Sequence, residues 1–266
     1  MPTTLVDGCN IYYDEIGKGQ PLVLIMGLGA DSSAWEEHYN AYKEHFRCIL
    51  IDNRGAGRSD KPDGSYTTKQ MAKDTVGVMD ALGIDKAHIS GISMGGAIAQ
   101  EIGIGYPERV RTLTLISTWA KCNVYMTRIF EMFKEVNGVI DGDAFTRMLQ
   151  LWIFPPQYHE DNFDDLLSRE ASGRQNPYPM PRQAFLSQCD ACITHDTVGK
   201  LGSIKVPTLV TVGDRDIFTP YENSRYIADS IAGSELEVLE GGGHTHHWEQ
   251  LSKFNEKTLK FLLENK

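Results

Sequence analysis

A serine that could act as a nucleophile lies at position 93, inside the G-x-S-x-G pentapeptide of residues 91–95. A β-type run, residues 87–90, precedes this motif and a helix-like run follows it. Its two glycines suit a turn so sharp that a Cβ at either position would collide, and such a turn holds the serine hydroxyl away from the backbone. A glycine-rich turn with an incidental serine would give the same pattern, so the rest of the chain must supply the partners.

A base and an acid follow Ser93 in an order that suits serine catalysis. His244 comes after three glycines that end the last predicted strand, and an imidazole has a suitable pKa to take the serine proton. Asp216 lies on the loop after the preceding strand, where its carboxylate would fix the imidazole tautomer. Asp214 on the same loop is expected to brace it. The order nucleophile, acid, base differs from the chymotrypsin and subtilisin arrangements and is that of the α/β-hydrolase fold.

Two backbone N–H groups are needed to bind the oxyanion that forms when a serine attacks a carbonyl carbon. The amide of Met94, directly after the nucleophile, is one candidate. Leu28 is the other, because it lies between Gly27 and Gly29 at the end of the apolar run of residues 22–26. Four separated segments therefore predict one nucleophilic site.

Two other groups of residues could indicate a metal. His244, His246 and His247 form an H-x-H-H cluster, but no acidic ligand motif accompanies it. Cys189 and Cys192 form a C-x-x-C pair that lacks the second pair expected of a zinc site. The alternative is two helical thiols three residues apart. We predict that the protein holds no metal, and that its five scattered cysteines form no disulfide framework.

Residues 22–52 also resemble a dinucleotide-binding unit, with a strand, a glycine-rich turn, a helix, a second strand and an acid at Asp52. Ser32 replaces the third glycine of that fingerprint, which should moreover open the whole fold. This alternative leaves Ser93, Asp216 and His244 unexplained. We therefore expect no cofactor.

Strands and helices alternate along most of the chain, which predicts a parallel α/β sheet. Apolar or alternating runs predict the strands, and apolar residues at helical spacing predict the helices. The expected strands are residues 3–6, 10–15, 22–26, 46–52, 87–90, 110–117, 206–212 and 235–240, and the expected helices outside the middle of the chain include one ending near residue 43, 67–82, one ending near 231, and 248–264.

The alternation breaks at Trp119, and helical patterns without a convincing strand continue to about Ser203. An all-helical insertion indicates a cap, so we predict a core of residues 1–118 and 204–266 with a cap of residues 119–203. Large apolar side chains at helical spacing in the cap most often pack against the core, but some are expected to line a substrate pocket. The predicted pocket residues are Trp119, Met126, Phe130, Phe133, Met148, Trp152 and Phe154.

Composition narrows the possible partners. The net charge of −10 over 266 residues provides no basic surface for nucleic acid. No apolar run approaches the roughly 20 residues that span a bilayer, and the first ten residues do not resemble a signal peptide. We expect a cytoplasmic monomer or homodimer that acts on a small molecule, with no nucleic-acid or membrane partner.

Over essentially its full length the chain resembles α/β-hydrolase fold proteins. The motifs that carry the resemblance are D-x-R-G-x-G-x-S at residues 52–59 and G-x-S-M-G-G at residues 91–96, and they are similar to those of carboxylesterases and 3-oxoadipate enol-lactonase-like serine hydrolases. The resemblance implies a mostly parallel, eight-stranded twisted sheet flanked by helices, with a helical cap. It assigns Ser93, Asp216 and His244 to a catalytic triad. Many members have His-Gly at the oxyanion turn, where this chain has Met26 and Gly27.

The implied activity is hydrolysis of a carboxylic ester or lactone through an acyl-serine intermediate, without a cofactor. The apolar cap predicts small-to-medium, largely apolar substrates. Hydrolysis of a C–C bond in ring-fission products and perhydrolase or haloperoxidase chemistry are alternatives on the same triad, and a non-catalytic ligand receptor is a further one. Epoxide and haloalkane hydrolysis are disfavoured, because those relatives have Asp where Ser93 stands.

Overall fold

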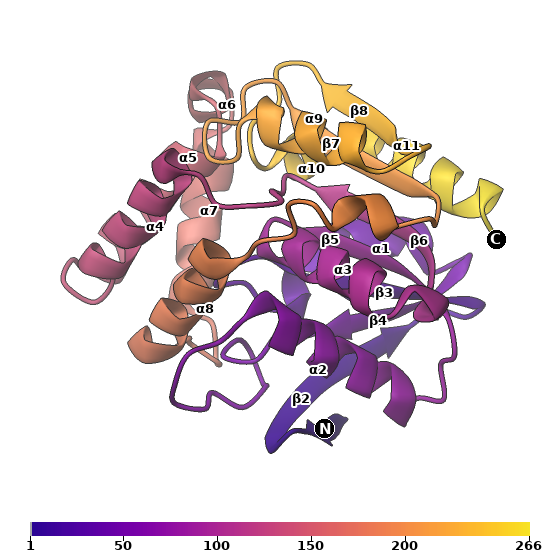
Figure 1. The fold of residues 1–266 in the computed structure, drawn as a ribbon. Helices are drawn as coiled ribbons and strands as arrows, with labels where there is room; N and C mark the ends of the chain where they lie inside the picture. The colour runs from indigo at the N-terminus through magenta and orange to yellow at the C-terminus, as the bar shows by residue number, and fades with distance from the viewer. Residues whose placement is uncertain (1) are drawn as a thin grey trace.

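The computed structural model describes residues 2–266, and an eight-stranded sheet runs through it (Figure 1). The strand order across the sheet is β1-β2-β4-β3-β5-β6-β7-β8. The first two strands pair antiparallel with each other, and β2 pairs antiparallel with β4, while every pair from β4 to β8 is parallel. The strands are β1 Thr3–Val6, β2 Cys9–Ile16, β3 Gln20–Ile25, β4 Phe46–Ile51, β5 Ala87–Ile92, β6 Val110–Ile116, β7 Thr208–Gly213 and β8 Glu235–Leu239. The prediction of a mostly parallel, eight-stranded sheet is confirmed.

Helices cover both faces of the sheet, and successive side chains of each strand point alternately into the two cores that result. In β3, Val23 and Ile25 join the core under helices α2 (Thr68–Ala81), α3 (Met94–Gly105) and α9 (Tyr221–Ser230). Leu22 and Leu24 join the core under α1 (Glu36–Tyr42) and α11 (Leu251–Glu264). Parallel strands buried on both faces require continuous apolar runs, and such runs made these strands predictable.

Five helices lie between β6 and β7 and gather at one end of the sheet, on the left in Figure 1. They are α4 Val124–Val136, α5 Gly142–Ile153, α6 Pro156–Asp161, α7 Phe163–Arg174 and α8 Arg182–Thr194. An isolated bridge between Lys121 and Asp196 joins the two ends of this helical segment. Asn123 and Asp141 cap α4 and α5 by accepting hydrogen bonds from the Met126 and Ala144 amides.

Two predicted helices are interrupted. The helix expected to end near residue 43 begins as a 3-10 turn, η1 (Ser32–Trp35), capped by Asp31, before α1 starts. The C-terminal helix is divided at Gln250 into α10 (His246–Glu249) and α11. The His246 ring contacts the hydroxyls of Ser117 and Thr211 at the end of the sheet, whereas Phe254 packs in the core under α1 and α11. The chain turns between these two positions. Two further 3-10 turns are η2 (Pro107–Arg109) and η3 (Leu201–Ser203), and no helix within residues 2–266 is long and apolar enough to cross a membrane.

Candidate active site

Ser93 lies in the sharp turn between β5 and α3. Its backbone has φ +56° and ψ −116°, in a region that a residue with a side chain rarely adopts. A Cβ at Gly91 would overlap the carbonyl oxygen of Gly95, and one at Gly95 would overlap that of Ile25. The close approach predicted for both glycines of the motif is therefore present.

Hydrogen bonds from the neighbouring strand hold this strained turn. The Ser93 amide donates to the carbonyl oxygen of Ile116 in β6 over 2.8 Å. The Thr118 hydroxyl donates to the Ser93 carbonyl oxygen over 2.8 Å. Because the Ser93 amide is bonded to the last residue of β6 and the Ser93 carbonyl to a residue just after it, the turn is held in place at the sheet edge.

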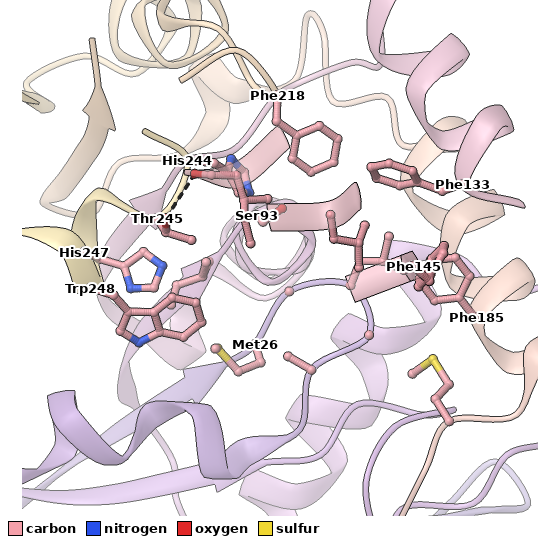
Figure 2. A pocket seen from close by; sticks show the side chains of 18 of the residues that line it. Met26, Ser93, Phe133, Phe145, Phe185, Phe218, His244, Thr245, His247 and Trp248 are labelled. Atoms are coloured by element: carbon pink, nitrogen blue, oxygen red, sulfur yellow. Dashed lines mark hydrogen bonds between the residues drawn. The ribbon is translucent and has the colours of Figure 1, made fainter. Parts of the chain in front are cut away.

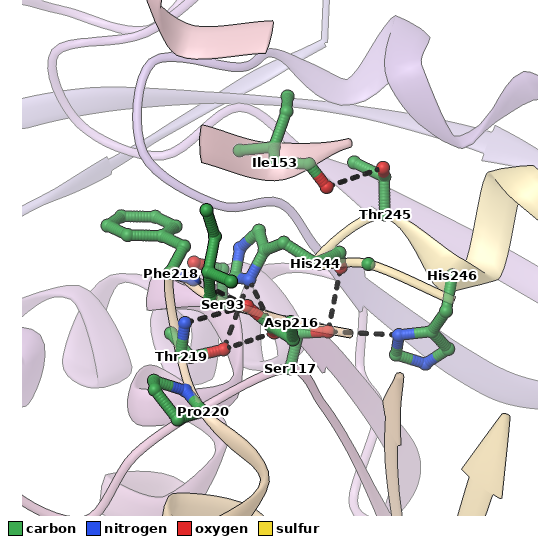
Figure 3. A network of polar contacts seen from close by, with 12 residues as sticks. Ser93, Ser117, Ile153, Asp216, Phe218, Thr219, Pro220, His244, Thr245 and His246 are labelled. Carbon is green, nitrogen blue, oxygen red and sulfur yellow. Dashed lines mark hydrogen bonds and ion pairs between the residues drawn. The ribbon is translucent and has the colours of Figure 1, made fainter. Parts of the chain in front are cut away.

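His244 and Asp216 meet beyond the ends of β8 and β7. Nδ1 of His244 lies 3.0 Å from Oδ2 of Asp216 (Figure 3). The other carboxylate oxygen of Asp216 accepts from the Phe218 and Thr219 amides, over 2.9 and 2.7 Å. Asp216 is fully buried as a side chain, and these contacts keep its carboxylate aimed at the imidazole.

Thr219 is a member of this network that the sequence reasoning missed. Its hydroxyl donates to Oδ2 of Asp216 over 2.7 Å and lies 3.0 Å from Nδ1 of His244. With a proton on Nδ1 of His244, the Thr219 hydroxyl can accept from that N–H while it donates to Asp216. The available signal was a hydroxyl residue three positions after Asp216, a spacing at which side chains commonly bond within a turn.

The three histidine rings of the H-x-H-H cluster face different partners. His244 contacts Asp216, whereas His246 lies 3.1 Å from the Ser117 hydroxyl and 3.0 Å from that of Thr211. Burial lowers the pKa of His246 to about 3, so this ring is neutral. Within residues 2–266 no three His, Cys, Asp or Glu side chains converge as a metal site would require.

The glycine run before His244 is held by two carboxylates. Oδ1 of Asp214 accepts from the Gly241 amide over 2.6 Å, so this side chain braces the loop. Oε2 of Glu249 accepts from the Gly243 amide over 3.0 Å. Burial raises the pKa of Glu249. Both bonds fix the backbone that carries the imidazole.

The turn that carries Leu28 passes close to Ser93. A Cβ at Gly27 would lie 3.2 Å from the Ser93 Cβ. The Met94 amide lies next to Ser93 in the chain, at the N-terminus of α3. Among the hydrogen bonds within residues 2–266, neither the Leu28 nor the Met94 amide donates to a protein acceptor. Both amides therefore remain available to a ligand oxygen near Ser93.

Two polar side chains hold this turn by hydrogen bonds. Nδ2 of Asn53 donates to the Met26 carbonyl oxygen over 2.9 Å. From helix α8, Oε1 of Gln188 accepts from the Gly29 amide over 3.0 Å, and its Nε2 donates to the Arg54 carbonyl oxygen over 2.9 Å. Gln188 is fully buried, and sequence reasoning did not identify it because its partners are remote in the chain.

Asp52 has an internal role that explains the dinucleotide-like pattern. Its two carboxylate oxygens accept from the Ser32 amide over 2.7 Å and from the Arg58 amide over 2.8 Å. The residues that mimic a ribose-binding acid and a phosphate-binding turn are thus bonded to each other.

Ser93 and His244 line one cavity of about 370 Å³ beneath helices α4, α5 and α8, and Figure 2 shows their side chains next to each other. Apolar groups make up most of its wall. The lining residues are Met26, Gly27, Leu28, Gly29, Ala30, Ile92, Ser93, Phe133, Asn137, Phe145, Leu149, Ile153, Met180, Phe185, Phe218, His244, Thr245, His247 and Trp248.

Of the seven predicted pocket residues, Phe133 lines this cavity and the other six do not. Trp119, Met126 and Phe130 are fully buried in the core beside the sheet. Phe154 stacks on Tyr158 with ring centroids 4.6 Å apart. Met148 and Trp152 are partly buried at the edge of the core. Helical spacing identified apolar faces, but whether a face meets the core or the cavity depends on how the helices pack.

The C-x-x-C pair belongs to the packing of α8. Cys189 and Cys192 are fully buried free thiols in the main core. Burial raises the pKa of both, which keeps them protonated and unreactive. The structure thus agrees with two helical thiols three residues apart.

Comparison with known proteins gives the family. Residues 20–251 match the model of the alpha/beta hydrolase fold. A protein of Azorhizobium caulinodans named "Putative carbamate hydrolase RutD" is 30% identical, with 98% of each chain covered. An enol-lactonase from Burkholderia xenovorans LB400 superposes with a TM-score of 0.90 at 26% identity, covering 98% of this chain and 100% of that one. Est816, described as an N-acyl homoserine lactone degrading enzyme, superposes with a TM-score of 0.85 at 29% identity, covering 98% of this chain and 100% of that one. The chain belongs to the alpha/beta hydrolase fold family.

Proposed function

We propose that this hydrolase cleaves carboxylic esters or lactones through an acyl-serine intermediate. The observation that carries the proposal is the cavity itself, where Ser93 lies beside His244 and His244 contacts the buried Asp216. A nucleophile, a base and an acid that orients the base are the three groups that acyl transfer requires.

In the acylation half of the proposed reaction, Oγ of Ser93 attacks the carbonyl carbon and its proton passes to Nε2 of His244. Asp216 holds the Nδ1–H of His244 and stabilises the imidazolium that forms. The amides of Leu28 and Met94 bind the oxyanion. The tetrahedral intermediate then collapses, and the alcohol leaves with the proton from Nε2.

In the second half, water attacks the acyl-serine while His244 removes a proton from it. Collapse of the second intermediate releases the carboxylic acid and returns the proton to Ser93. With a lactone, the alcohol and the acid are two ends of one product.

The lining of the cavity favours neutral substrates of small to medium size. Among the described lining residues there is no Asp, Glu, Lys or Arg, so a charged substrate group would lose water without gaining a counter-ion. We propose that helices α4–α8 act as a cap, because they supply Phe133, Phe145, Leu149 and Phe185 to the wall opposite the sheet.

Carbamate hydrolysis is a second candidate, because a relative with that name matches nearly the full length of both chains. Attack on a carbamate carbonyl would use the same Ser93, His244 and oxyanion amides. The cavity offers no cation to a free carbamate anion, so on this chain the neutral ester or lactone fits better. C–C bond hydrolysis and perhydrolase chemistry remain alternatives that use the same three side chains.

The test is hydrolysis of p-nitrophenyl butanoate by the full-length protein, compared with the Ser93→Ala variant. We expect turnover to fall by at least about 10³-fold, since loss of the nucleophile removes the covalent route. Ser224→Ala is a matched control, because Ser224 is a buried serine on α9 that does not line the cavity. A phosphonate should add its mass to the wild type and not to Ser93→Ala. Wild-type turnover in Ser93→Ala would overturn the proposal.

A further inference from the structure

A buried pair of histidines connects the cavity wall to helices α1 and α11. Nδ1 of His247, a cavity-lining residue, lies 3.1 Å from Nε2 of His38 in α1. Nδ1 of His38 lies 2.9 Å from Oδ1 of Asn255 in α11. Both rings are fully buried, and neither takes part in the proposed acyl transfer.

The orientation of Asn255 sets the direction of this chain of hydrogen bonds. Its Nδ2 faces the Glu37 carbonyl oxygen at 3.4 Å, which only a donor can satisfy, so Oδ1 is the atom that faces His38. Oδ1 is an acceptor, and Nδ1 of His38 must therefore carry a proton.

Both imidazoles are neutral, because burial lowers the pKa of His38 to about 4 and that of His247 well below its usual value. A neutral imidazole has one donor and one acceptor nitrogen. With its proton on Nδ1, His38 presents an acceptor at Nε2, and His247 must donate from its own Nδ1. The remaining nitrogen of His247, Nε2, is left with a lone pair.

His247 belongs to the cavity wall. Figure 2 shows the His247 ring between Thr245 and Trp248. Nε2 has no hydrogen-bond partner within residues 2–266, yet it is not among the side-chain atoms that are both buried and unpartnered. We infer that Nε2 faces the cavity, because it is not sealed within the protein and His247 lines that cavity. The nearby Thr245 hydroxyl is occupied by the Ile153 carbonyl and Glu249.

We propose that Nε2 of His247 accepts a hydrogen bond from a hydroxyl or amide N–H on the substrate, and so selects esters or lactones that carry such a donor. This inference rests on the proposed hydrolase function. His247 would touch the substrate, whereas His38 and Asn255 are positioning residues that act through its tautomer. In an apolar cavity, one fixed acceptor stabilises a bound substrate that carries a matching donor, and it disfavours a substrate without one because the acceptor is then covered unpaired.

Long-range ¹H–¹⁵N NMR of the full-length protein at pH 7 tests the tautomer without any turnover, with His247→Asn assigning the resonances. We expect His247 to be neutral and protonated at Nδ1. A hydroxylated ketone, which has the shape of an ester but no leaving group, should shift the Nε2 resonance, and the same ketone without the hydroxyl should not. Protonation at Nε2, or equal responses to the two ketones, would overturn the inference.

Steady-state kinetics tests whether the enzyme prefers substrates that carry a hydrogen-bond donor. The ratio of kcat/KM for a p-nitrophenyl hydroxyacyl ester to that for the plain acyl ester of equal length should be about 3 to 10. An α-acylamino-γ-butyrolactone compared with its α-alkyl counterpart tests the amide donor in the same way. The ratios should approach one in His247→Asn, which keeps a donor towards His38, and also in Asn255→Leu, although Asn255 does not line the cavity.

His45→Asn is the matched control, because His45 is an exposed histidine, and it should keep the wild-type ratios. Ratios near one in the wild type, with plain esters still hydrolysed, would defeat the inference and leave the hydrolase proposal standing. Failure to hydrolyse any ester, with the NMR result as expected, would defeat the hydrolase proposal instead.

Discussion

Gln188 and Gly29 are 159 residues apart in the sequence and are joined by a hydrogen bond of 3.0 Å from the glycine amide to the glutamine side chain. This bond ties helix α8 to the turn whose Leu28 amide we assign to the oxyanion. The position of the helical segment and the shape of the proposed oxyanion site are therefore coupled.

Substitution Gln188→Met keeps the side-chain length and removes the acceptor for Gly29 and the donor to Arg54. We expect kcat for ester hydrolysis to fall about 10-fold with a smaller change in KM, because the turn would act mainly in the transition state. Steady-state kinetics measures this. Gln183→Met, at an exposed position of the same helix, should behave as the wild type. Equal kinetics for the two variants would show that the bond has no role in the turn.

Thr219→Val removes the hydroxyl between Asp216 and His244 while keeping the side-chain shape. We expect a loss of about 5- to 20-fold in kcat/KM, since the acid and the base each lose a partner. The pH dependence of kcat/KM should also shift, which a purely structural loss would not cause. Thr219→Ser should restore most of the activity. A valine variant with the wild-type pH profile would contradict the assignment.

Phe145 lines the cavity and Phe130 is buried in the core, so substitutions at the two positions test these two roles separately. Phe145→Ala enlarges the cavity wall, so the preferred p-nitrophenyl acyl chain should become longer. Phe130→Ala should instead lower the free energy of unfolding by about 3–5 kcal/mol without changing that preference, because Phe130 is fully buried in the core. Chain-length profiles and urea unfolding measure the two effects. A longer preferred chain in Phe130→Ala alone would reverse the assignment.

Gly95→Ala places a methyl group against the carbonyl of Ile25 in the adjacent strand. We expect loss of activity together with a marked fall in thermal stability, because neither backbone can move away from the turn. Gly105→Ala lies in the same helix with open space around it, and should be neutral or stabilise by up to about 1 kcal/mol. Calorimetry of both variants gives the comparison. A fully active Gly95→Ala would show that the turn is looser than described.

Acid should destabilise the protein through its buried histidines. Burial lowers the pKa of His88 and His195 from 6.5 to about 4. Between these values the unfolded chain binds protons that the folded chain does not, so stability is complete above pH 6.5 and falls as the pH drops towards 4. Each such histidine contributes a slope of up to about 1.4 kcal/mol per pH unit.

Urea unfolding across this pH range measures the slope. His88→Gln should reduce the slope of the unfolding free energy against pH by the contribution of one buried histidine. His45→Gln, at an exposed position, should leave that slope unchanged. A free energy of unfolding that does not vary between pH 6.5 and 4 would contradict the assignment of neutral buried imidazoles.

Local patterns in the sequence determined the sheet and the candidate catalytic segments. Continuous apolar runs specified strands buried on both faces, and the two glycines around Ser93 are required by backbone contacts within the turn itself. Parallel strands end at one edge of a sheet, so residues that follow β5, β7 and β8 are brought together by topology alone. Ser93, Asp216 and His244 could for this reason be proposed from the sequence.

Tertiary packing decided what the cavity contains. Phe130 and Phe133 share a helix face and are buried in the same core cluster, yet only Phe133 also lines the cavity. Gln188, His38 and Asn255 act on partners more than a hundred residues away. Periodicity describes one helix at a time, whereas such contacts depend on the position of one element against another, and that position is set by the packing of the whole chain.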